Sequence, residues 1–104
     1  MAISEKRYAA EMIDSGGNAF KFDDIGCMVH FAQRRGWMAR PPERFVHDYD
    51  SGAWLEAASA TFVRSPEIPS PMASGLIATK DPAAAERYAV QFHGRVTSLA
   101  EIWK

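Results

Sequence analysis

The sequence of 104 residues has a single cysteine, Cys27, and this scarcity limits what the chain can be. One cysteine excludes an internal disulfide framework and any metal site built from cysteines alone. No apolar run approaches the roughly 18 residues needed to cross a membrane, and no signal peptide begins the sequence. We therefore expect any export segment of the native protein to lie outside this sequence.

An excess of positive charge is missing as well. Lys and Arg number 12 against 13 Asp and Glu, which gives a net charge of -1. Nucleic-acid binding needs a basic patch that contacts phosphates, so we expect no nucleic-acid partner. The phosphate loop, the dinucleotide fingerprint, the zinc motif HExxH and the Gly-x-Ser-x-Gly elbow are all absent. The sequence therefore does not favour an enzyme.

The first half of the sequence predicts a hairpin, a helix and a third strand. Turn residues at 14–18 separate two strand-like segments at about 7–13 and 19–22. Asp24 is a strong N-cap, and Gly36 is a good residue to follow a helix. A strand is expected at about 44–49. One buried helix face is predicted from the spacing i, i+3, i+4 and i+7 of Ile25, Met28, Val29 and Ala32.

The second half repeats this organisation. Strands are expected at about 60–64 and 75–80, on either side of a proline-rich loop at 65–74 that cannot form a central strand. Asp81 followed by Pro82 is a specific helix start, Gly94 ends the helix, and a strand is expected at 95–99. The buried face of this helix is predicted to carry Ala85, Tyr88, Ala89 and Phe92.

We predict an α+β fold from this repeat. Residues 1–104 would form one domain of two ββαβ units, at about 7–49 and about 60–99, with mixed or antiparallel sheets and one helix each. Either unit alone could bury little apolar surface, so the two should share a core.

Three sets of side chains could bind a metal ion. In the first set, Cys27 and Met28 lie in the first turn of the predicted helix, close to His30. The N-terminus of the helix would lower the pKa of the thiol and favour the thiolate. The alternative is that Met28 belongs to the apolar face and that Cys27 is a small buried hydrophobe.

The second candidate is Met72, in the loop stiffened by Pro69 and Pro71. A thioether is a soft ligand and selects Cu(I) over hard ions. The alternative is a methionine that fills a gap in the core beneath the loop.

The third set consists of carboxylates that could bind Mg²⁺ or Ca²⁺. Capping and turn roles are the favoured interpretation of this set, and His47 and His93 are expected to be structural too. The set contains Asp23, Asp24, Asp48 and Asp50.

Longer motifs add information. The run Phe22-Asp23-Asp24-Ile25-Gly26-Cys27-Met28 is followed by Val46-His47-Asp48-Tyr49, by the segments 52–57 and 65–68, and by Pro71-Met72-Ala73-Ser74-Gly75. In this order the motifs resemble the NosL family, the accessory lipoproteins of nitrous-oxide reductase assembly, along nearly the whole chain.

The resemblance implies a copper function without catalysis. Proteins of this family bind Cu(I) and are implicated in its delivery to the copper centres of nitrous-oxide reductase in the periplasm. They are attached to the membrane through an N-terminal lipid anchor. Their fold of two ββαβ units agrees with the repeat described above.

The resemblance also implies a copper site. The family uses a Cys-x-Met motif just before the first strand, joined by the methionine of the Pro-Met loop, which here is Met72. Met1 stands where the methionine of the motif would fall, and the cysteine two residues earlier is not part of this sequence. We therefore expect weaker copper binding than in a relative with the whole motif. Cys27 and Met28 are second-choice ligands.

Two other classes of function remain open. The missing cysteine favours an interaction module of the same fold without a working metal site. Cys27 suggests, more weakly, a cysteine-dependent lyase or redox enzyme, an analogy that rests on fold alone.

Overall fold

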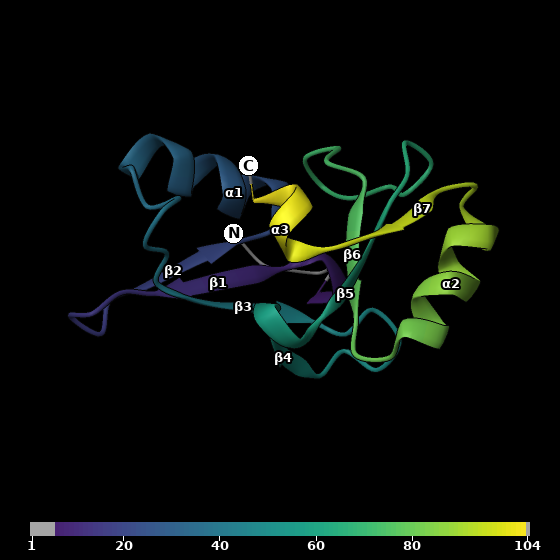
Figure 1. Cartoon of the computed structure of the whole chain (residues 1–104), viewed down its shortest axis with the longest axis horizontal. Helices are drawn as coiled ribbons and strands as arrows, with labels where there is room; N and C mark the ends of the chain where they lie inside the picture. The colour runs from purple at the N-terminus through teal and green to yellow at the C-terminus, as the bar shows by residue number, and fades with distance from the viewer. Residues whose placement is uncertain (1–5, 104) are drawn as a thin grey trace.

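The computed structural model describes residues 6–103, which form two antiparallel sheets with helices packed against them (Figure 1). The elements in chain order are η1 (Lys6–Tyr8), β1 (Ala10–Ile13), β2 (Ala19–Phe22), α1 (Ile25–Arg35), β3 (Glu43–His47), β4 (Trp54–Glu56), η2 (Ala57–Ser59), β5 (Thr61–Arg64), β6 (Leu76–Thr79), α2 (Pro82–Gln91), β7 (Arg95–Thr97) and α3 (Leu99–Ile102).

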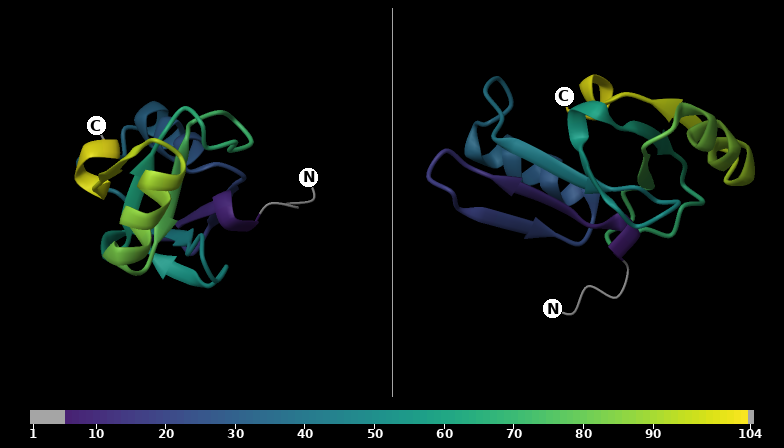
Figure 2. Two further views of the ribbon diagram at one scale, coloured as in Figure 1. Left: turned by 90° about the vertical axis from the view of Figure 1, so that its right-hand side faces the viewer. Right: turned by 90° about the horizontal axis from the view of Figure 1, so that it is seen from below.

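The two sheets repeat one topology. The first has the strand order β2-β1-β3-β4, and the second has the order β6-β5-β7. In the first sheet, β1 lies between its hairpin partner β2 and the strand after the helix, β3. In the second sheet, β5 lies between its hairpin partner β6 and the strand after the helix, β7. The predicted α+β fold with two ββαβ units is therefore confirmed, and β4 adds a fourth strand to the first sheet. Figures 1 and 2 show α1 beside the first sheet and α2 beside the second.

Both helices begin where the caps predict. The carboxylate of Asp24 accepts a hydrogen bond from the Gly26 N–H at 2.7 Å, and that of Asp81 accepts one from Ala83 at 3.1 Å. Helix α1 ends at Gly36, whose φ of 72° lies in the left-handed region that a residue with a side chain rarely adopts.

The second sheet forms the middle layer of the molecule. Phe62 and Ala78 point from one of its faces into a core cluster with α1 and the first sheet, and Val63 and Ile77 point from the other face towards α2. All four residues of β6 are buried, because both faces of this strand are covered. The two units thus share a core.

The end of β3 joins the first sheet to the second. Tyr49 donates its N–H to the carbonyl of Ala78 at 2.8 Å, and Asp48 forms a parallel bridge with the same residue. One carboxylate oxygen of Asp48 accepts the N–H of Lys80, and the other accepts the hydroxyl of Ser51. These bonds fix the relative position of the two sheets at this end.

The structure corrects the sequence prediction in four places. Helix α2 ends at Gln91 rather than at the predicted stop Gly94. Residues 6–8 form a 3-10 turn rather than the start of β1, and β4 was not predicted as a separate strand. The last predicted strand ends at Thr97, because Ser98 caps the short helix α3 with its hydroxyl. The signal for this helix is Ser98 followed three residues later by Glu101, a capping-box pattern.

The predicted helix faces are largely confirmed. The four residues predicted for α1 are buried, whereas on α2 only Ala85 of the predicted face is fully buried; Tyr88, Ala89 and Phe92 are half-buried against the second cluster. The helices formed within residues 6–103 are all too short or too polar to cross a membrane.

Candidate metal site

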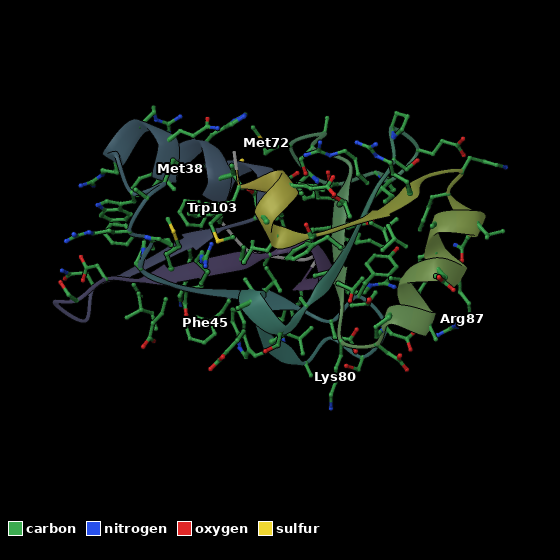
Figure 3. All side chains as sticks on the ribbon, in the orientation of Figure 1. Met38, Phe45, Met72, Lys80, Arg87 and Trp103 are labelled. Carbon is green, nitrogen blue, oxygen red and sulfur yellow. The ribbon has the colours of Figure 1, made fainter. Side chains whose placement is uncertain are left out.

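Met72 lies at the surface, on the loop between β5 and β6. Its side chain is 62% exposed, whereas Met12 and Met28 are buried and Met38 is half-buried. Figure 3 shows Met72 on the loop beside the start of α1. The alternative that Met72 fills a gap in the core is therefore wrong, and its thioether is open to solvent.

Although the side chain is exposed, the backbone of this loop is held by hydrogen bonds. The hydroxyl of Ser70 accepts the N–H of Gly75 at 3.0 Å, and the carbonyl of Ser70 accepts that of Ala73 at 3.0 Å. Ala73 has a φ of 60°, an unusual conformation for a residue with a side chain. The loop therefore has a specific folded conformation rather than a loose one.

Asp24 links the loop to the start of the helix. Its Oδ1 caps α1 through Gly26, and its Oδ2 accepts the N–H of Met72 at 2.9 Å. Burial acts to raise the pKa of Asp24, but hydrogen bonds from Ser74, Met72, Gly26 and Ser70 together lower it below its ordinary value. The carboxylate is therefore ionised at neutral pH, although it is completely buried.

Two glycines allow the loop to pack this closely. A Cβ on Gly26 would lie 2.5 Å from the Cβ of Ser74, and one on Gly75 would lie 2.3 Å from the carbonyl oxygen of Ser65. Gly75 also has a φ of 70°, which a side chain would disfavour. The two motifs at 22–28 and 71–75 are far apart in the sequence, but they pack directly against each other.

Cys27 and Met28 lie at the same end of α1 but differ in their surroundings. Met28 is fully buried in the core, so the structure gives it the packing role. Cys27 is partly buried; burial raises the pKa of its thiol, and the carboxylates of Asp24 and Asp23 raise it further. The prediction that this pKa is lowered is wrong, because burial and these two negative charges raise it.

His30 lies apart from the buried face of α1. It is exposed and lines an open groove of about 400 Å³ together with Ser74 and Arg64. Within residues 6–103, no three His, Cys, Asp or Glu side chains are grouped so that they could hold a metal ion.

Three of the four carboxylates of the third set have structural partners. Asp24 and Asp48 hold backbone N–H groups, as described, and Asp50 accepts the hydroxyl of Tyr88 at 2.6 Å. His47 is buried and contacts the carbonyl of Ala9 through Nδ1, which agrees with a structural role. His93 pairs with Glu67 at 3.0 Å.

Met1 lies outside the residues that the structure describes. The first described segment along the chain is η1, which contacts β6. Tyr8 of this segment belongs to the same apolar cluster as Ile68 of the 65–75 loop. The register pairs Ala10 with Phe22, two residues before Asp24. The described chain therefore enters β1 at the end of the sheet where Asp24 meets the Met72 loop.

Comparison with known proteins adds to this geometry. The model of one protein family, described as NosL, matches residues 1–104, which is the whole sequence. The chain belongs to the NosL family. The resemblance noted in the sequence is thus confirmed. No curated protein matches the chain at a significant level.

A solved NosL structure has the same fold. The crystal structure of the copper chaperone NosL from Shewanella denitrificans superposes with a TM-score of 0.78 at 16% sequence identity. The match covers 89% of this chain and 75% of that chain. At this identity the likeness shows the fold alone.

In this member of the NosL family, sequence reasoning found the cap role of Asp24 but missed its contact with Met72. The two residues are 48 positions apart, and no local pattern signals the contact. The close approach of Gly26 to Ser74 was missed for the same reason.

Proposed function

We propose that this chain is a copper-binding accessory protein that carries Cu(I) and catalyses no reaction. The observation that carries the proposal is Met72, an exposed thioether on a loop whose backbone is hydrogen-bonded in place. Thioether sulfur is a soft donor that prefers Cu(I) to Mg²⁺ or Ca²⁺. Among the methionines of residues 6–103, Met72 alone is exposed.

A single thioether is a weak site, so we propose further donors. Met1 would supply a second thioether, and a cysteine two residues before it would supply a thiolate. The position of η1 beside the cluster that contains Ile68 supports this arrangement. Cys27 and Met28 remain second-choice ligands; the raised pKa of Cys27 and the complete burial of Met28 weigh against them.

We also propose a cellular role. Membership of the NosL family and the likeness to a protein described as a copper chaperone support a metallochaperone. The copper would be delivered to the copper centres of nitrous-oxide reductase, or to its assembly proteins, outside the cytoplasm. In this proposal the complete protein is a periplasmic lipoprotein, and its contact with the membrane is the lipid anchor.

The proposal is tested by titrating Cu(I) against a competing chelator. Two forms are compared: the chain as it stands, and a chain extended by Cys-Ala so that the cysteine, the alanine and Met1 form a Cys-x-Met motif. The extended chain should bind Cu(I) at least tenfold more tightly. Met72→Leu should remove most of this gain and leave the thermal midpoint nearly unchanged, because leucine preserves volume and the side chain is exposed.

Met38→Leu is the matched control, because Met38 is a half-buried methionine without a proposed ligand role. It should leave Cu(I) affinity within twofold of the parent. If Met72→Leu binds copper as tightly as the extended parent, Met72 is not a ligand. If neither form binds copper, the chain is an interaction module of this fold.

A further inference from the structure

Asp24 does more than an N-cap requires. A cap needs one side-chain oxygen that accepts a hydrogen bond from the first turn of the helix, and Oδ1 meets this need through Gly26. The second oxygen, Oδ2, is bonded to the N–H of Met72. Asp81 is the matched case on α2: it caps that helix in the same way and contacts no loop in the hydrogen bonds of the described chain.

We propose that Asp24 is a positioning residue for the copper ligand Met72, which it holds by the backbone next to the exposed thioether. This proposal rests on the proposed function. In it, the buried carboxylate of Asp24 orients the loop that carries Met72.

The energetics favour this role. Hydrogen bonds between a charged acceptor and backbone N–H groups are stronger than neutral ones. Asp24 is completely buried, so a lost partner would not be replaced by bulk water. The bond therefore restrains the loop at Met72 itself, and less conformational freedom remains to be lost when the thioether binds an ion.

The surrounding loop strengthens the restraint. The hydroxyls of Ser70 and Ser74 both lower the pKa of the Asp24 carboxyl, and they lie 3.4 Å apart. The absence of a Cβ at Gly26 lets Ser74 approach the helix. The carboxylate thus holds the loop at Met72, between two serines whose hydroxyls favour its charged form, while the thioether stays exposed.

The test compares Asp24→Ser with Asp81→Ser. Serine is a good N-cap, so both variants keep a cap oxygen, but the shorter side chain with one oxygen cannot also hold Met72. Hydrogen exchange of the Met72 amide, measured by NMR on the full chain, should become at least tenfold faster in Asp24→Ser. It should stay within twofold in Asp81→Ser.

Copper affinity supplies the second readout, in the chain extended by Cys-Ala. Asp24→Ser should lower Cu(I) affinity at least fivefold, and Asp81→Ser should change it less than twofold. In the Met72→Leu background, Asp24→Ser should have no further effect, because the double-mutant cycle isolates the coupling between the two residues. If Asp24→Ser does not fold, Asp24→Asn, which preserves side-chain size, carries the same comparisons.

Unchanged exchange of the Met72 amide overturns the proposal, and so does an affinity loss of equal size in the Met72→Leu background. These failures leave copper binding by Met72 intact. Failure of the proposed function gives a different result: Met72→Leu then leaves Cu(I) affinity unchanged, whatever the hydrogen-exchange rate of the Met72 amide in Asp24→Ser.

Discussion

Cys27 and Met72 are sulfur residues at the same end of α1, and their surroundings give them different chemistry. Met72 presents a neutral thioether to solvent. Because the group carries no charge, moving it between water and the protein interior has no charge-desolvation penalty. Cys27 is a partly buried thiol beside two carboxylates, those of Asp24 and Asp23. Its nucleophilic form is the thiolate, which these surroundings disfavour.

We predict a slow thiol at neutral pH. Burial and the two neighbouring carboxylates raise the pKa of Cys27, so the protonated form persists to higher pH than in a free cysteine. The rate of reaction with an aromatic disulfide reagent, followed against pH, should therefore have its midpoint above that of a small free thiol. Cys27 is the single cysteine, so the signal has one source.

Asp23→Asn is the control for this prediction. It removes one of the negative charges near the thiol and leaves the cap residue Asp24 in place, so the midpoint should move down. A midpoint at or below that of a free thiol in the parent chain would contradict the prediction and reopen the possibility of a reactive cysteine.

At this scale the sequence predicted packing better than chemistry. The spacing of Met28 along the helix identified it as a core residue, and the structure confirms this. The pKa of Cys27 depends on its burial in the folded chain and on the charges of Asp24 and Asp23 at the start of α1. The second bond of Asp24, to Met72, depends on tertiary structure alone.

The elements differ in how firmly they are buried. Phe62 of β5 is completely buried between the layers, whereas Phe92 at the end of α2 is half-buried and packs near Tyr49 and Tyr88. Phe62 and Phe92 are both apolar residues that the sequence places in predicted elements. Only the order of the layers in the structure shows that Phe62 has neighbours on all sides.

We predict different costs for truncating these two phenylalanines. Phe62→Ala should lower the free energy of unfolding by about 3–5 kcal/mol, because it leaves a cavity in a packed core. Phe92→Ala should lower it by about 1–3 kcal/mol, since part of the ring is already in water. Urea denaturation of both variants measures the difference, and equal losses would contradict the burial shown by the structure.

Element prediction succeeded where local signals were strong. The caps Asp24 and Asp81 and the stop at Gly36 fixed the helices to within a few residues. Helix α3 was missed because Leu99 continues a strand-like run, although Ser98 and Glu101 carried a capping signal. The pairing of β4 with β3 could not be predicted, because a strand of three residues has little periodicity.

The whole molecule should unfold as one unit. The second sheet contributes Phe62, Leu76 and Ala78 to the cluster of the first unit, and its other face forms the second cluster. Neither cluster can lose its packing without exposing the strands β5 and β6.

We predict coincident unfolding transitions in urea from probes in the two clusters. Tryptophan fluorescence reports on the first unit through Trp37 and Trp103, which pack with the first cluster, and through the exposed Trp54 of β4. Ring NMR signals of Tyr8 and Tyr49 report on the second cluster. Their midpoints should agree, as expected for a two-state domain. Loss of the tyrosine signals at lower urea than the fluorescence change would show that the two units unfold separately.

The exposure of Met72 has a consequence for the rate at which cargo could leave. A ligand on the surface leaves one side of a bound ion open to an incoming donor from another protein. The donor could then bind before the thioether dissociates, so copper would pass by ligand exchange and never be released as a free ion. A buried methionine such as Met28 would first require local unfolding of the core. An exposed and a buried methionine could therefore give the same copper affinity but very different transfer rates. The exposed position of Met72 favours fast transfer.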